Sequence, residues 1–446
     1  MSAIAVIGGG IAGLTVAHYL SAEHDVVVFE AETAPGGKIR SERIGEFLFE
    51  HGPSGFLSSA QAVRALVSEV GLDDVMVEAA PAAKNRFIYW DGKLHKLPSK
   101  PPEVFKMSLL SARGKVRALG ELFVSRSTGD SDEDESVYRF MERRFGREVA
   151  ERIATPALLG ISGGDAASTS LAAIFPRLPV MEREHGSVLR GMMRGGRTAA
   201  RTCSFSGGGM QRLTDRLAER LGNRLLLGTA IRRIDRHAQR WSVTHDGGET
   251  VVDGVVVTTP ADVAALLVEG FDPDLAAQLR GISYAPMRAI GVAFAAADVP
   301  ATLDGFGFLA ARGCGVRILG ATYTSTIMPD QAPPGTVSLR MFIGGATDPG
   351  AATLDAEAVR AIVLADLATV FGITAPPIAY HDVLWKRAIP QYSLRHRATV
   401  NAIAERAAAY PSFALAGNAY RGIGVGDTVS DARAVAATIS ASVGGA

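Results

Sequence analysis

The chain has 446 residues, of which 47% are hydrophobic and 21% are charged, a composition typical of globular proteins. This length exceeds one ordinary hydrophobic core and predicts two or three domains. Lysine plus arginine equals aspartate plus glutamate at 46 each, so no overall field attracts nucleic acid, and none is expected as a partner.

The cysteines, the histidines and the lack of a long apolar run bear mainly on the cellular compartment of the protein. The two cysteines, Cys203 and Cys314, have no redox or metal spacing and are expected to be free thiols in a reducing compartment. The nine histidines also lack ligand spacing, so no metal site is predicted. There is no signal-peptide pattern and no apolar run of about 18 residues. A cytoplasmic protein is expected, free or peripheral on the inner face of the cytoplasmic membrane.

The first elements predict a dinucleotide-binding unit. Residues 3–7 and 26–29 have the apolar character of buried strands, and helical periodicity lies between them. An acidic residue, Glu30, follows the second strand. The chain therefore has a strand, a glycine turn, a helix, a second strand and an acid, in the order that the dinucleotide fingerprint requires. The residues of the turn and helix start are Gly8, Gly9, Gly10, Ile11, Ala12 and Gly13.

Each part of this unit has an expected role. Gly8 permits the tight turn, Gly10 lets the backbone approach a pyrophosphate, and Gly13 lets the helix lie close to the strand. The helix start presents free N–H groups and its positive dipole end to phosphates. Glu30 accepts hydrogen bonds from ribose hydroxyls, and its charge disfavours a 2′-phosphate.

Three further segments favour FAD over NAD. They are residues 34–38, with sequence APGGK; residues 253–260, an apolar run ending in Thr259 and Pro260; and residues 417–427, a glycine-rich turn before a helical stretch. Each segment alone is explained as an ordinary structural turn. Together they suit a long dinucleotide, because the last turn is a second helix start able to bind anions or carbonyl groups.

The middle of the chain has a different pattern of expected secondary structure. Residues 86–90 and 93–97 flank Asp91-Gly92 and predict a β-hairpin, while 288–295 and 337–343 predict strands of a second sheet. Between Lys93 and Cys203 the periodicity is helical. Its acidic run, 130–135, is interpreted as solvated. Residues 105–123 predict an amphipathic helix, which either packs on its own domain or lies on a membrane surface.

These segments resemble the flavin amine-oxidase-like superfamily and, within it, the family of oxygen-dependent protoporphyrinogen oxidases. Nearly the whole chain takes part in the resemblance. Its more specific motifs are Glu50–Phe56 (EHGPSGF), Lys84–Phe87 (KNRF), Phe175-Pro176, Met181–His185 (MEREH), Gly305–Leu309 (GFGFL), Ile389–Tyr392 (IPQY) and Gly417–Tyr420 (GNAY). Three departures stand out: Lys38 where the family often has Arg, Ser162-Gly163 where Tyr and Ala are common, and Thr428 where Cys is common.

The resemblance implies an α/β fold with a Rossmann-like FAD-binding domain, a mixed-sheet substrate domain and an inserted helical domain. The implied FAD-binding domain is discontinuous and comprises residues 1–57, 204–260 and 411–446. The substrate domain comprises 58–92 and 261–410. The helical domain comprises 93–203.

The resemblance also assigns roles to single residues. No side chain is expected to be catalytic, because the flavin N5 carries the chemistry. The residues expected to contact FAD are Gly8, Gly9, Gly10, Ile11, Ala12, Gly13, Glu30, Gly37, Lys38, Gly52, Pro53, Ser54, Ile231, Thr259, Trp385, Gly417, Ile423, Gly424 and Val425. The residues expected to contact the substrate are Arg86, Phe306, Gly307, Leu309 and Phe342. From the residues alone, Arg86 is better explained as a solvated hairpin charge, and Phe306 and Leu309 are ordinarily core residues.

The implied activity is oxidation of protoporphyrinogen IX to protoporphyrin IX with oxygen, in haem biosynthesis. Coproporphyrinogen III, which has more carboxylates, is the nearest alternative substrate. Another flavin amine-oxidase-like enzyme is a second alternative; an amine oxidase would need an aromatic cage, for which Trp385 and Tyr420 are the candidates. A prenyl-binding chaperone on this scaffold is a non-enzymatic alternative. Membrane contact through the helical domain and a homodimer are further expectations.

Overall fold

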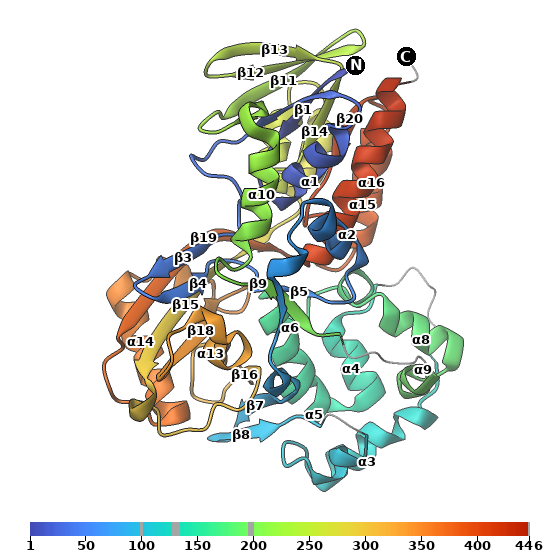
Figure 1. Ribbon diagram of the computed structural model, residues 1–446. Coiled ribbons are helices and arrows are strands. Elements are labelled where there is room, and N and C mark those ends of the chain that lie inside the picture. The colour runs from blue at the N-terminus through green and yellow to red at the C-terminus, as the bar shows by residue number, and fades with distance from the viewer. Residues whose placement is uncertain (99–100, 127–133, 195–199, 445–446) are drawn as a thin grey trace.

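The computed structural model describes residues 1–98, 101–126, 134–194 and 200–444. One part of the molecule is built on a five-stranded parallel sheet, with helices beside it in Figure 1. In sheet order its strands are β10 (Leu225–Leu226), β2 (Asp25–Phe29), β1 (Ala3–Ile7), β14 (Gly254–Val257) and β20 (Phe413–Leu415).

Both faces of this sheet are covered, which explains why its strands are apolar throughout. Ile4 and Val6 of β1 face one core, and Ala5 and Ile7 face the other. The first core is completed by helices α1 (Ile11–Leu20), α2 (Gln61–Glu69), α10 (Gln211–Leu221) and α16 (Val425–Gly444). The second is completed by α11 (Ala261–Val268), α12 (Pro273–Arg280), α15 (His396–Ala407) and the antiparallel sheet β11 (Ile231–His237), β12 (Arg240–His245) and β13 (Gly248–Val252).

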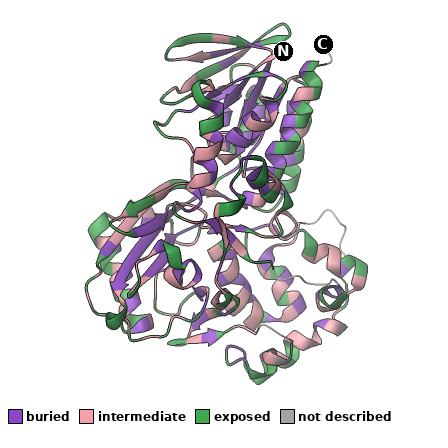
Figure 2. Cartoon of the chain, in the orientation of Figure 1, coloured by how far each residue is buried: buried purple, intermediate pink, exposed green. Residues whose placement is uncertain are grey.

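A second, mixed sheet of seven strands forms another part of the molecule, and its central strands are largely buried (Figure 2). Its strand order is β19 (Ala379–Pro390), β15 (Tyr284–Ala295), β18 (Thr336–Gly344), β17 (Gly320–Thr322), β16 (Gly307–Ala310), β7 (Arg86–Trp90) and β8 (Lys93–Lys96). The pair β16–β7 is parallel, and the other pairs are antiparallel. Helix α14 (Ala356–Phe371) packs its apolar face on this sheet, and the short α13 (Thr324–Ile327) precedes β18.

Helices dominate residues 101–194 where the structure describes them. They are α3 (Ala112–Leu119), α4 (Val137–Phe145), α5 (Arg147–Val149), α6 (Thr155–Ser162), α7 (Leu171–Ile174), α8 (Arg177–His185) and α9 (Val188–Arg194). The remaining strands form the pair β3 (Ser41–Ile44) and β4 (Phe47–Glu50), and the small sheet β5 (Phe56–Leu57), β9 (Thr202–Phe205) and β6 (Met76–Glu78).

The α/β fold class with a Rossmann-like sheet, a mixed sheet and a helical region is confirmed. The predicted hairpin is also confirmed, and Asp91 and Gly92 take positive φ of 51° and 70° at its turn. The residue limits of the three domains stay a prediction.

Two sequence predictions about local structure are wrong. The predicted helix over 105–123 is interrupted, because Ser111 caps a new helix by accepting from the Gly114 N–H at 3.0 Å. That helix ends at Leu119 and is followed by a short 3-10 helix, Gly120–Phe123. The resemblance implies a strand over 228–231 that carries Ile231, but β11 begins only at Ile231, and Gly228 has a φ of +65°. Of the acidic run, 130–133 lie outside the described residues, whereas Glu135 pairs with Arg143 at 2.7 Å.

Candidate functional site

The candidate cofactor residues gather at one edge of the parallel sheet. Strands β1, β2, β14 and β20 run parallel, so their carboxyl ends meet there. Gly8 follows β1, Glu30 follows β2, Thr258 follows β14, and Gly417 lies two residues beyond β20. Ligands of open parallel sheets bind outside this edge. The opening and closing glycine turns therefore lie on the same side of the molecule.

The opening turn has the geometry expected for its glycines. Gly8 has a φ of +112°, which disfavours any other residue. A Cβ at Gly13 would overlap the Gly8 carbonyl oxygen, so glycine lets α1 pack on the turn. At Gly10 a Cβ would meet only the Gly37 Cα, at 3.9 Å. Gly10 thus borders open space at the start of α1, where Ile11 and Ala12 form the first turn.

Glu30 joins the turn to a second segment. Its carboxylate accepts from the Gly9 N–H at 2.5 Å and from the Glu32 N–H at 2.8 Å. Its backbone carbonyl accepts from the Thr229 N–H at 2.8 Å, two residues before Ile231. Glu30 and the segment that leads to Ile231, another expected FAD contact, are therefore neighbours, although 201 positions separate Glu30 from Ile231.

The segment 36–38 lies against both the opening turn and the loop at 52–54. The Gly36 N–H donates to the Gly9 carbonyl at 2.8 Å, and a Cβ at Gly52 would overlap the Lys38 carbonyl. Burial lowers the pKa of Lys38 to about 8. Among the described residues, no carboxylate lies within ion-pair distance of the Lys38 ammonium. A buried cation without a counter-ion fits a bound anion.

The closing turn is fixed by Tyr392. Its hydroxyl donates to the Asn418 carbonyl at 2.8 Å and accepts from the Gly422 N–H at 2.7 Å. Helix α16 begins at Val425, directly after Ile423 and Gly424. Gly417 has a φ of +127°, and its Cβ position lies 3.8 Å from the Thr258 carbonyl oxygen. Thr258 in turn donates its hydroxyl to the Gly8 carbonyl, while the predicted Thr259 is its neighbour.

Sequence reasoning missed Arg340, which holds the 50–52 backbone. Its guanidinium is buried and donates to the carbonyls of Glu50, at 3.0 Å, and of Gly52. It also lies 4.4 Å from the centre of the Phe342 ring. Burial lowers the pKa of Arg340 to about 10 and raises that of the Glu50 carboxyl to about 7. The signal in the sequence was a single charge within the apolar strand predicted over 337–343.

Trp385 fastens the same loop from β19. Its indole N–H donates to the His51 carbonyl at 2.9 Å, one residue before Gly52. The backbone at 50–52 is therefore held from two strands of the mixed sheet. The contact of Gly52, Pro53 and Ser54 with FAD stays a prediction.

The predicted substrate residues divide into two groups. Arg86 starts β7, and its guanidinium carbon lies 4.6 Å from the centre of the Phe306 ring. Leu309 instead packs toward α6, close to where a Gly160 Cβ would lie. Gly307 has a φ of +145°, and a Cβ there would overlap the Ala321 carbonyl of β17. For Gly307, strand packing explains the glycine without any ligand.

The departures at 162–163 and 428 have structural explanations. Gly163 ends α6 with a φ of +62°, and a Cβ there would meet the Met287 sulfur at 2.7 Å. The Ser162 hydroxyl donates back to the Leu158 carbonyl at 3.0 Å. The Thr428 hydroxyl likewise donates to the carbonyl four residues before it, that of Gly424, at 2.9 Å at the start of α16.

The residues present fit a bound FAD. Within the described structure, α1 has no side-chain cap at Gly10 and no acid in its first turn, so its first N–H groups are available to phosphate. The open space at Gly10 lies beside the 36–37 backbone, which touches Gly9 and Gly10, while the Lys38 ammonium lies 5.3 Å from the centre of the Tyr284 ring. The uncapped N–H groups of α1 and the open space at Gly10 suit a bound pyrophosphate.

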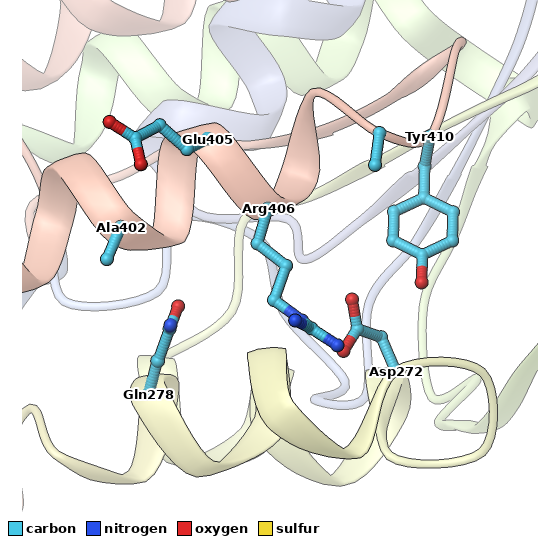
Figure 3. A pocket seen from close by; sticks show the side chains of 7 residues that line it. Asp272, Gln278, Ala402, Glu405, Arg406 and Tyr410 are labelled. Carbon is cyan, nitrogen blue, oxygen red and sulfur yellow. The ribbon is translucent and has the colours of Figure 1, made fainter.

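A groove between α12 and α15, of about 460 Å³, is unrelated to these residues (Figure 3). Arg406 and Asp272 meet in it at 2.5 Å. None of its lining residues is a predicted cofactor or substrate residue.

Comparison with known proteins agrees with this geometry. A model of the family "flavin containing amine oxidoreductase" matches residues 11–440. The chain is 32% identical to the chloroplastic protoporphyrinogen oxidase of Oryza sativa subsp. japonica, over 98% of this chain and 87% of that protein. It is 28% identical to the coproporphyrinogen III oxidase of Bacillus subtilis, over 97% and 96%. A crystal structure from Exiguobacterium sp. 255-15 shares the fold, with a TM-score of 0.85, 24% identity and 98% coverage of both chains. The chain belongs to the flavin containing amine oxidoreductase family and is an FAD-dependent oxidoreductase.

Proposed function

We propose that this chain oxidises protoporphyrinogen IX to protoporphyrin IX, with oxygen as the electron acceptor. Its similarity to a protoporphyrinogen oxidase over almost its whole length supports this function. FAD, when bound, accepts hydride equivalents at N5. The proposed tasks of the chain are to hold the substrate against the flavin ring, to orient it through its carboxylates and to exclude water.

The observation that carries the proposal is Arg86. Its guanidinium lies over Phe306 at the β7–β16 pair, and the residue remains exposed to solvent. Across the described chain, no carboxylate lies within ion-pair distance of it. An arginine placed in this way is available to a substrate carboxylate, and Phe306 offers an apolar surface to a flat macrocycle.

A single arginine of this kind favours the porphyrinogen with fewer carboxylates. The other two arginines on the mixed-sheet strands β15 and β18 are engaged: Arg288 pairs with Asp382 at 2.6 Å, and Arg340 holds the 50–52 backbone. Coproporphyrinogen III, with its additional carboxylates, would leave more charge uncompensated. Side-by-side turnover of the two porphyrinogens tests this preference; faster turnover of coproporphyrinogen III would reverse it.

Two alternatives receive less support. Tyr420, a candidate for an amine-binding cage, is 4% exposed and belongs to the apolar core on the parallel sheet. A flavin-free prenyl chaperone would have no need of the buried Lys38 cation beside the opening turn. Purified protein that lacks flavin absorbance would favour that chaperone.

Arg86→Ala is expected to lower kcat/KM for protoporphyrinogen IX about 10- to 150-fold, as loss of a charge-assisted contact costs about 1.5–3 kcal/mol. Flavin content should not change, because Arg86 is distant from the opening turn in the fold. Arg360→Ala is a matched control. Arg360 lies on α14, and its guanidinium carbon is 4.9 Å from the centre of the Tyr380 ring, so it also contacts an aromatic ring but is not an expected substrate residue. Equal kinetics for the Arg86 variant and the wild type would remove Arg86 from the site.

We also propose that the helical region contacts a membrane surface. In the parts of the chain that the structure describes, each helix lacks the length or apolar character needed to cross a bilayer. Phe105, Val116 and Phe123 are nevertheless 64, 73 and 85% exposed, next to Lys106, Lys115 and Arg117. Exposed apolar groups beside basic ones suit an anionic lipid surface. The expected homodimer stays a prediction.

Phe105→Ser combined with Phe123→Ser is expected to lower sedimentation with anionic phospholipid vesicles by at least about fivefold, since each substitution removes about 1.5–3 kcal/mol of burial in lipid. Val251→Ser on β13, where Val251 is 47% exposed, serves as the control. Equal vesicle binding by the double variant and the wild type would contradict membrane contact through this surface.

A further inference from the structure

Three residues from distant parts of the chain bring potential metal ligands together. Glu42 lies on β3, His51 directly follows β4, and His381 lies on β19. The Nε2 atoms of His51 and His381 lie 3.1 and 3.8 Å from the same Glu42 carboxylate oxygen. All three ligand atoms lie within 4.8 Å of one another. No metal-ligand spacing is visible in the sequence, because Glu42 and His51 lie about 330 positions from His381 and only the fold brings them together.

Aromatic packing fixes the two imidazole rings. His381 stacks between Phe49, with ring centres 5.8 Å apart, and His51, with ring centres 4.7 Å apart. The planes of these pairs differ by 12° and 29°, so the rings lie nearly parallel. Rings held in this way keep their nitrogen atoms in place without any ion, which lowers the entropy cost of binding one.

The donor atoms are available to a cation. The His381 Nε2 is buried and, within the described residues, has no hydrogen-bond partner. A buried ring nitrogen without a partner is unfavourable unless something occupies the space that it faces.

We propose that Glu42, His51 and His381 bind one divalent transition-metal ion of the zinc type. Two imidazole nitrogens and one carboxylate oxygen are ligands that Zn²⁺ prefers, at about 2.0–2.2 Å. Tetrahedral ligands at that distance lie roughly 3.3 Å apart, and the separations of 3.1 and 3.8 Å need only small side-chain shifts to match. The Glu42 side chain is 51% exposed, so water completes the coordination.

The ion would join the β3–β4 pair to strand β19, next to residues expected to contact FAD. Glu42 and His51 belong to the β3–β4 pair, and His381 belongs to β19, which also carries Trp385. Trp385 already donates to the His51 carbonyl, next to Gly52. The metal therefore acts as a clamp on the loop at 52–54. Arg40 lies near His51, and its charge opposes a cation, which weakens the site. This inference is independent of the substrate.

Zinc titration of tag-free, FAD-bound protein tests the site. After chelator treatment and buffer exchange, competition with a chromogenic chelator should show one Zn²⁺ per chain that also raises the Tm. Glu42→Gln and His381→Asn should each weaken that binding by at least about tenfold. His245→Asn is the control, because His245 lies on β12 and contacts Thr250 instead. Flavin content, measured in each variant, confirms an intact fold.

Two results would overturn the proposal. One is zinc binding by the wild type that is no stronger than in the Glu42 and His381 variants. The other is an equal loss in the His245 variant, which would indicate general surface binding.

Discussion

Gly10→Val should produce a folded protein that has lost FAD affinity by about 100-fold or more, equivalent to about 2.8 kcal/mol. The backbone at Gly10 has φ −75° and ψ 178°, which valine adopts without strain. A Cβ there meets only the Gly37 Cα, at 3.9 Å, so the protein itself tolerates the side chain. The added methyl groups instead enter the space at the start of α1 that the pyrophosphate needs. Flavin absorbance per chain and circular dichroism measure the two effects separately.

A matched pair of variants makes this result specific. Gly120→Val adds the same side chain at a helix end where a Cβ has open space, and it should keep its FAD. Gly13→Ala should disturb folding itself, because its Cβ would overlap the Gly8 carbonyl oxygen. Full flavin content in folded Gly10→Val would show that the cofactor does not approach this turn.

Arg340→Met should destabilise the protein by about 2–6 kcal/mol, because each of two carbonyl acceptors left without its donor costs about 1–3 kcal/mol. The substitution keeps much of the apolar stem but leaves the Glu50 and Gly52 carbonyls without their donor. The Glu50 carboxylate retains the Ser41 hydroxyl at 2.7 Å and the Met210 N–H at 2.8 Å, so the loss falls mainly on the loop. We therefore also expect a shifted flavin spectrum.

Urea unfolding measures the first effect, and the visible spectrum of the remaining bound flavin measures the second. Arg317→Met is the control: Arg317 pairs with Asp348 at 2.7 Å but is 36% exposed, so its loss should cost about 1 kcal/mol or less. If both variants lost the same small amount of stability, Arg340 would not support the loop.

The strand–glycine turn–helix–strand unit at the start of the chain could be predicted because its signals are local. Gly8, Gly13 and Glu30 lie within one strand–helix–strand unit, where spacing alone determines neighbours. The predicted strands over 288–295 and 337–343 became β15 and β18, since apolar runs of that length suit a buried sheet. Helix limits within 105–123 were wrong because a single capping serine, Ser111, outweighed the amphipathic pattern.

Long-range contacts could not be predicted in the same way. Arg340 reaches the 50–52 backbone only because β18 lies against that loop, and no periodicity reveals such a pairing. The group formed by Glu42, His51 and His381 depends likewise on the approach of β19 to β4. Tyr392 and Gly422 meet across 30 positions. In each case the missing information was sheet and loop packing rather than residue type.

Anaerobic mixing of the purified yellow protein with protoporphyrinogen IX tests whether the bound flavin oxidises this substrate. We expect the flavin absorbance to bleach on mixing and to return when oxygen is admitted, and porphyrin fluorescence to grow as oxygen supports further rounds. Flavin that stays oxidised with protoporphyrinogen IX, in protein that is fully loaded with FAD, would contradict it.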